Sequence, residues 1–172
     1  MVNKQYDLII VGAGIAGSAL ACALGGSELK VAIIEAQAVK AQWPTLEVAI
    51  DGYDARVSAL TATSTAFLTA LGVWPSIAQR RISPYRHMQV WDADGTGSIA
   101  FHAQDINQAA LGHIVENRLT SAALLARLGE HSNIELLAPL RLSSMDLTDG
   151  QRRLVMEDGS IVQAPWWWRP MG

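Results

Sequence analysis

A glycine-rich turn placed directly after a short apolar segment constrains the fold of this chain more than any other feature. Residues 6–11 form a nearly continuous apolar run, which is typical of a strand buried on both faces of a parallel sheet. Gly12, Gly14 and Gly17 follow at once. A segment of small residues, Ile15 to about Leu24, then favours a helix. The pattern predicts a strand, a tight turn and a helix in immediate succession.

Each glycine in this turn has a distinct physical role. Gly12 lets the chain turn sharply off the strand, Gly14 leaves room for a pyrophosphate beside the backbone, and Gly17 lets the helix pack closely on the sheet. The pyrophosphate then meets the free N–H groups of the helix N-terminus. Glu35 ends a second apolar strand, residues 29–35, where its carboxylate can accept hydrogen bonds from ribose hydroxyls and repel a 2′-phosphate. The unit therefore predicts a dinucleotide site, with FAD and NAD both open.

The remaining chain mixes helical and strand patterns. Residues 36–54 are irregular, with Pro44 and Gly52, and indicate a surface excursion. We expect an α/β fold, with a Rossmann-like βαβ domain and an additional β-rich segment. The expected helices are 58–71 and 117–128, and the expected strands are 85–92, 98–102, 134–137, 140–146, 153–157 and 161–164.

Composition narrows the class of protein. A net charge of -3 without a Lys/Arg run gives no reason to expect a nucleic-acid partner. No apolar run approaches the ~20 residues of a membrane span, and the N-terminus lacks a signal peptide, so we expect a cytoplasmic protein that can touch a membrane from outside. The single cysteine, Cys22, reads as a buried hydrophobe. The histidines show no metal-ligand spacing, so no metal site is expected; they are His87, His102, His113 and His131.

Four later segments carry a resemblance to a known family. They are Asp54–Leu60 (DARVSAL), Leu71–Trp74 (LGVW), Pro84–Asp92 (PYRHMQVWD) and Leu111–Asn117 (LGHIVEN). In order and spacing the chain resembles the ubiquinone-biosynthesis hydroxylases of the class A flavoprotein monooxygenases, from about Tyr6 to Pro165. The 2-polyprenylphenol and polyprenyl-methoxy-benzoquinol hydroxylases are the most similar branch. In that family the first of these segments opens a helix.

This resemblance implies that the dinucleotide is FAD. The guanidinium of Arg56 could neutralise a pyrophosphate or engage a polar edge of the isoalloxazine, and a plain surface arginine is the alternative. Arg118 would face the cofactor phosphates, although relatives can carry other residues at that position. The cofactor-binding residues implied are Gly12, Gly14, Gly17, Glu35, Arg56 and Arg118.

The reaction implied by the resemblance uses NAD(P)H to reduce FAD and delivers one oxygen atom of O2 to a prenylated phenol or quinol. The flavin supplies the chemistry, so no catalytic side chain is assigned and none is required. A prenylated substrate implies peripheral contact with a membrane, or with other ubiquinone-biosynthesis proteins. Two alternatives stay open: a non-catalytic nucleotide-binding fragment, and an NAD-dependent reductase.

The chain departs from the family pattern in two places. The family is about twice as long or more, and its motif G-D-A-A-H-x-x-x-P, which binds the flavin, is absent. After Pro165 the family continues as a core strand, whereas this chain reads WWWRPMG. Read one base earlier, the codons of that tail can encode the family strand and its D-G pair. We therefore expect a truncated FAD-binding domain at 1–165 and a frameshifted tail at 166–172, with a genuine Trp-rich terminus as the alternative.

Overall fold

The structure, a computed structural model, describes residues 3–39, 42–46, 52–148 and 150–169. The chain divides into two units, and each is considered by itself. The first unit contains Met1–Trp43 and Ser121–Gly172, and the second contains Pro44–Thr120. Helix α4 (Asn117–Leu128) carries the chain from the second unit back into the first.

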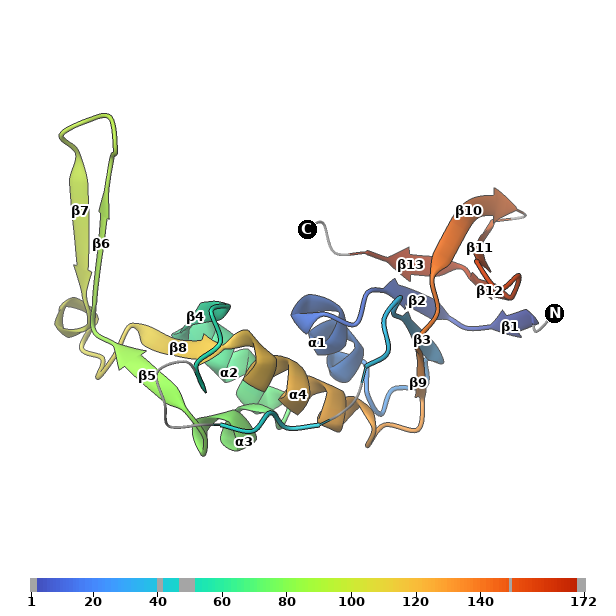
Figure 1. Ribbon diagram of the computed structural model, residues 1–172, viewed down its shortest axis with the longest axis horizontal. Helices are drawn as coiled ribbons and strands as arrows, with labels where there is room; N and C mark the ends of the chain where they lie inside the picture. Colours follow the sequence, from blue (N-terminus) through green and yellow to red (C-terminus); the bar gives the residue numbers. More distant parts are fainter. Residues whose placement is uncertain (1–2, 40–41, 47–51, 149, 170–172) are drawn as a thin grey trace. The chain divides into compact units, whose positions relative to one another are not determined.

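A parallel sheet forms the centre of the first unit, in the order β13-β2-β3-β9 (Figure 1). All its neighbouring strands are parallel. The apolar runs explain the two inner strands: each residue of β3 is buried, and Ile9 and Ile10 of β2 are inaccessible to solvent. The strands are β2 (Leu8–Val11), β3 (Val31–Ile34), β9 (Ile134–Leu137) and β13 (Trp166–Trp168), and helix α1 (Ile15–Ala23) packs on β2 and β3.

The first unit contains a second sheet, in the order β1-β12-β11-β10. Its strands are β1 (Asn3–Gln5), β10 (Leu142–Thr148), β11 (Gln151–Met156) and β12 (Ile161–Ala164). Its buried side chains, among them Leu154, Met156 and Val162, share one core cluster with Ile9 and Ile34 of the parallel sheet. Each large side chain buried in this way contributes about 1.5–3 kcal/mol relative to exposure. The expected α/β class and Rossmann-like unit are confirmed.

The tryptophan-rich segment is part of this unit. Trp166–Trp168 form the edge strand β13, which pairs in parallel with Leu8–Ile10. Trp167 packs against the core cluster, whereas Trp166 is 72% exposed. An edge position tolerates these side chains because one indole faces the core and its neighbour faces solvent. The frameshift hypothesis itself stays a prediction.

The second unit is built on a three-stranded antiparallel sheet, in the order β4-β8-β5. It contains β4 (Val57–Thr61), β5 (Ile82–Tyr85) and β8 (Gly112–Glu116), with helices α2 (Ala62–Ala70) and α3 (Trp74–Ala78). The expectation of a helix over 58–71 is wrong for its first turn. Val57–Thr61 pair with β8 instead, and the helix begins only after Thr61, whose side chain accepts a hydrogen bond from the Ser64 N–H.

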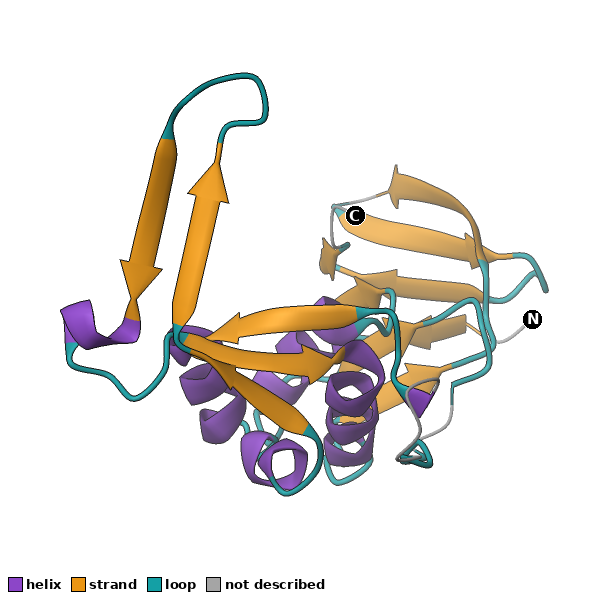
Figure 2. Ribbon diagram, turned by 60° about the vertical axis from the view of Figure 1, so that its left-hand side comes forward, coloured by secondary structure: helices purple, strands orange, loops and turns teal. Residues whose placement is uncertain are grey.

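The expected strand over 85–92 is also divided. Its start belongs to β5, and β6 (His87–Trp91) pairs only with β7 (Ser98–His102), in a hairpin followed by a short 3-10 helix, η2 (Ala103–Ile106). The hairpin extends away from β5 and β8, and no helix covers it (Figure 2). All its strand residues are exposed, including Trp91.

Among the described helices, none combines the length and the hydropathy of a membrane-crossing segment.

Candidate dinucleotide-binding site

The turn between β2 and α1 has the geometry that its glycines predict. Gly12 adopts a φ of 108°, a region that side-chain-bearing residues rarely enter, and its N–H donates to the Ile34 carbonyl at 2.7 Å. This hydrogen bond ties the turn to the end of β3. A Cβ atom at Gly17 would lie 1.9 Å from the Gly12 carbonyl oxygen and 3.3 Å from the Ile10 side chain. Only glycine therefore allows α1 to approach the strand this closely.

Gly14 is different, because its surroundings are open. A Cβ atom at this position would meet no atom within 4 Å, and its φ of -68° is accessible to any residue. Gly14 is the N-cap of α1, but it supplies no side-chain hydrogen bond to the first helical turn. The N–H groups of that turn lack helical acceptors, and the helix dipole adds positive potential there. Protein packing does not explain glycine at this position, whereas an anionic ligand does.

Glu35 closes the loop from the side of β3. One carboxylate oxygen accepts the Ala13 N–H at 3.0 Å, and the other accepts the Gln37 N–H at 2.9 Å. These bonds fix the half-buried carboxylate beside the glycine turn and leave further lone pairs for ligand hydroxyls. The Leu140 N–H donates to the Glu35 carbonyl at 2.7 Å, which ties the segment between β9 and β10 to the same corner.

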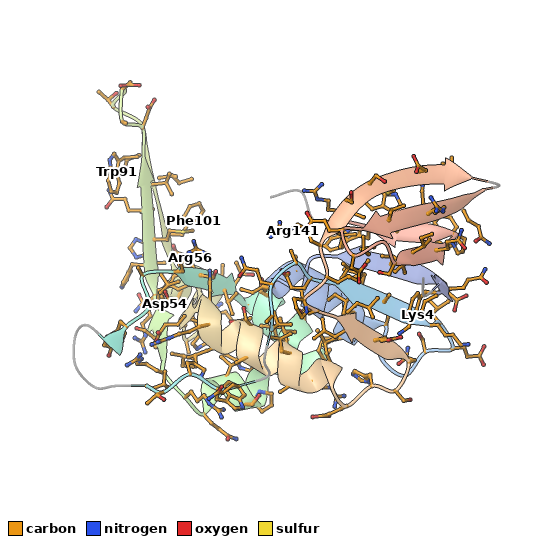
Figure 3. All side chains as sticks on the ribbon, turned by 45° about the vertical axis from the view of Figure 1, so that its right-hand side comes forward. Lys4, Asp54, Arg56, Trp91, Phe101 and Arg141 are labelled. Carbon is orange, nitrogen blue, oxygen red and sulfur yellow. The ribbon has the colours of Figure 1, made fainter. Side chains whose placement is uncertain are left out.

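A cavity of about 290 Å³ opens at this corner. Gly12 and Glu35 line one part of it, and Leu140, Arg141 and Arg169 line another. Arg141, labelled in Figure 3, directly precedes β10. Sequence reasoning missed these last three residues, because they are far from the turn in the sequence and carry no motif. The open cradle at Gly14 and the fixed acid beside the cavity fit the adenosine diphosphate part of a dinucleotide.

The two arginines assigned by resemblance belong to the second unit. The Arg56 side chain is exposed, and among the described residues it has no hydrogen-bond or ion-pair partner (Figure 3). The Arg118 guanidinium instead pairs with Glu116 at 2.6 Å and donates to the Gly52 carbonyl at 2.6 Å. The structure therefore brings Gly12, Gly14, Gly17 and Glu35 together within one unit and does not relate them to these arginines. Their assignment to the cofactor stays a prediction.

Glu116 is the centre of a charged cluster that sequence reasoning did not identify. Its side chain is only 4% exposed, yet it accepts from the Asp54 N–H at 2.9 Å, from Arg81 at 2.7 Å and from Arg118. Arg81 also donates to the Gly52 carbonyl at 2.9 Å, and its guanidinium lies 3.8 Å from the centre of the Tyr53 ring. Burial alone would raise the pKa of Glu116, but the hydrogen bonds from Arg81, the Asp54 backbone and Arg118 outweigh it, so the pKa is lowered.

A buried cysteine and a pair of histidines are further titratable groups of the chain. Cys22 is buried, as expected, and burial raises its pKa to about 11. His87 and His102 face each other across the exposed hairpin, with their Nδ1 atoms 2.6 Å apart. Within the described ranges no group of three or more potential ligands could hold a metal ion.

Comparison with known proteins identifies homologues along most of the chain. Residues 10–65 match the family described as NAD(P)-binding Rossmann-like domain. The 3-demethoxyubiquinol 3-hydroxylase of Escherichia coli is 32% identical over 95% of this chain and 40% of its own length. The mitochondrial ubiquinone biosynthesis monooxygenase COQ6 of Dictyostelium discoideum is 32% identical over 84% of this chain and 31% of its own length. The chain thus spans less than half the length of these relatives, and the predicted resemblance is confirmed.

Solved structures support the fold. The p-nitrophenol 4-monooxygenase PnpA of Pseudomonas putida superposes with a TM-score of 0.70 at 16% identity, over 98% of this chain and 41% of its own. PqsL of Pseudomonas aeruginosa, described as a probable FAD-dependent monooxygenase, gives 0.68 at 17% identity, over 94% of this chain and 41% of its own. At such identity the likeness establishes the fold alone.

Proposed function

We infer that this chain belongs to the ubiquinone-biosynthesis hydroxylases, corresponding to an N-terminal part of them, and we propose that it binds FAD. The observation that carries the proposal is the open cradle at Gly14 beside the fixed carboxylate of Glu35. Among the described residues, none outside the immediate chain neighbours comes within 4 Å of a Cβ atom placed at Gly14, and the N-cap supplies no side-chain hydrogen bond. The names of the relatives describe a monooxygenase and a hydroxylase, and this oxygen-transfer chemistry supports a flavin over simple nicotinamide binding.

Each proposed ligand residue has a separate task. The backbone at Gly14 accommodates the diphosphate, and Gly12 and Gly17 give the turn its shape. Glu35 accepts hydrogen bonds from the ribose hydroxyls. Arg56, whose side chain has no partner among the described residues, would offer a cation to an anionic part of the cofactor, and Arg118 would face the cofactor phosphates.

For the whole protein we propose hydroxylation of a prenylated phenol or quinol with NAD(P)H and O2. The bound flavin would supply the oxygen-transfer chemistry, and the protein would bind, orient and exclude water. The relatives act in ubiquinone biosynthesis according to their names, and the one from Dictyostelium is mitochondrial. For this chain we propose a cytoplasmic location with peripheral membrane contact, because a prenylated ring partitions into lipid.

FAD titration tests the cofactor directly. FAD should quench the tryptophan fluorescence of the chain and bind at least about tenfold more tightly than FMN, which lacks the adenosine half. Equal affinity for the two flavins would contradict the proposal, because the glycine loop and Glu35 would then contribute nothing.

An NAD-dependent reductase remains the second candidate, since the matching family is described as NAD(P)-binding. Tighter binding of NADH than of FAD would favour it. Stimulation of NAD(P)H oxidation by an added phenol would favour a monooxygenase over a non-catalytic nucleotide-binding fragment.

A further inference from the structure

We propose that His87 and His102 form a binding site for one Cu(II) ion on the β6–β7 hairpin. The sheet register places the two residues opposite each other on adjacent strands. Their Nδ1 atoms lie 2.6 Å apart, and the rings meet edge to face with their centres 4.8 Å apart. Both residues belong to the second unit, and the inference does not depend on the proposed FAD binding.

The spacing of the histidines along the chain does not reveal this pair, because the two residues are fifteen positions apart. The ladder runs from His87 and His102 to Trp91 and Ser98 without a register shift. Residues that lie opposite each other in antiparallel strands point to the same face, with their Cβ atoms about 5 Å apart. Strand pairing therefore brings together two ligands that the expectation of no metal site, which considered spacing alone, left separate.

The two imidazoles are arranged for chelation. A hydrogen bond between the Nδ1 atoms requires one ring to donate a proton and the other to accept it. When both rings carry their proton on Nε2, two lone pairs face the same small space, and a metal ion satisfies both. Both side chains are exposed, so small rotations can open the 2.6 Å separation. Two nitrogens at right angles, each about 2.0 Å from one ion, need about 3 Å.

The short separation of the nitrogens favours copper over zinc. Right angles between ligands belong to the tetragonal geometry of Cu(II), whereas the tetrahedral geometry of zinc spreads two nitrogens further apart. Cu(II) also binds nitrogen ligands most tightly among the divalent first-row ions. The Asp105 carboxylate accepts the His102 N–H at 3.2 Å and places a negative charge beside the pair. Water completes the coordination, because among the described residues no third metal-ligating side chain joins the two histidines.

The ion would link two strands that few other contacts hold together. No helix covers the hairpin, and all residues of its two strands are exposed (Figure 2). A two-stranded ribbon is marginally stable in water by itself. An ion bound by one ligand from each strand binds the paired state more tightly than the separated one, so it shifts the hairpin toward pairing. The site is therefore a metal-dependent clamp on the hairpin.

Titration of Cu(II) into the wild-type chain, His87→Gln, His102→Gln and the double variant tests the site. The wild-type chain should bind one ion at least about tenfold more tightly than either single variant. The double variant should be no weaker than about twofold beyond the single ones, because one histidine alone cannot chelate. His131→Gln, which removes an imidazole from the first unit, is the matched control and keeps the wild-type affinity. Circular dichroism shows that each chain is folded.

Two further measurements follow the geometry and the clamp. Zn(II) should bind at least about tenfold more weakly than Cu(II). Saturating Cu(II) should slow amide hydrogen exchange of residues 87–102 in the wild-type chain and leave it unchanged in His87→Gln.

The contrary results are equally definite. Equal Cu(II) affinity of the wild-type chain and His87→Gln would assign the ion to other groups and overturn the site. Zinc binding as tight as copper binding would contradict the right-angle geometry, and unchanged exchange in the wild-type chain would overturn the clamp. No flavin is present in these experiments, so their failure leaves the proposed function intact, and a chain that binds no FAD leaves the copper site intact.

Discussion

The glycine turn of the first unit and the Glu116 cluster of the second unit show two ways of building a rigid charged site. The turn relies mainly on backbone: Gly12 and Gly17 allow a close approach, α1 has no side-chain cap, and the Glu35 carboxylate accepts the Ala13 N–H. The cluster uses side chains: one buried carboxylate holds two arginines and a backbone N–H. The first arrangement leaves its polar groups open to a ligand, and the second consumes nearly all of its own. In the proposed function, it is the polar backbone groups left open at the turn, more than net charge, that would bind the ligand.

The largest expected effect tests whether the turn depends on bare backbone. In Gly17→Ala the new methyl group would overlap the Gly12 carbonyl, so the free energy of unfolding should fall by about 3 kcal/mol. Gly14→Ala is the matched control, because its methyl group enters open space and should cost less than about 1 kcal/mol. Urea unfolding followed by circular dichroism measures both. Equal losses would remove the distinction between the packed and the open glycine.

The second prediction tests whether the cluster stabilises its unit. Glu116→Gln keeps the shape of the side chain but removes the negative charge that Arg81 and Arg118 both contact, so the free energy of unfolding should fall by about 2 kcal/mol. Glu157→Gln, which affects an exposed pair with Arg141, should change stability by less than about 0.5 kcal/mol. An unchanged urea midpoint for Glu116→Gln would mean that the cluster contributes no stability.

The pH dependence provides an independent check. The folded pKa of Glu116 lies below its ordinary value of 4.5, so its contribution is present above pH 4.5 and is lost as the pH falls through the folded pKa. Between pH 5 and pH 3 the wild-type chain should therefore lose on the order of 1 kcal/mol more stability than Glu116→Gln does. Parallel stability curves for the two chains would contradict this account.

The smallest effect compares the two helix N-termini. The Thr61 side chain caps α2 by accepting the Ser64 N–H at 3.2 Å, whereas α1 begins at Gly14 without such a bond. Thr61→Ala should reduce stability by about 1 kcal/mol and leave FAD affinity unchanged. Weaker FAD binding in this variant would show that the capped helix also serves the ligand.

The glycine turn could be predicted from sequence because its determinants are local. A strand, three glycines and an acid lie within one short segment, and each has a steric or hydrogen-bonding reason that needs no knowledge of the rest of the chain. The split between β5 and β6 at Arg86 could not be seen, because a continuous β pattern does not reveal that its two halves join different sheets.

The Glu116 cluster was beyond prediction for a different reason. Its members lie at Gly52, Asp54, Arg81, Glu116 and Arg118, and only the pairing of β4 and β5 with β8 brings them together. The helix expected over 58–71 shows the same limit. Ala59 and Leu60 intrinsically favour a helix, but the pairing of this segment with β8 overrides that local preference.

Calorimetric titration of FAD into the wild-type chain and into Gly14→Ala tests the central claim most directly. The wild-type chain should release or absorb heat with a single-site isotherm. The variant, with unchanged thermal unfolding, should bind at least about tenfold more weakly, because its methyl group occupies the space of the diphosphate. Equal affinity of the two chains for FAD, or no heat from either, would contradict the account.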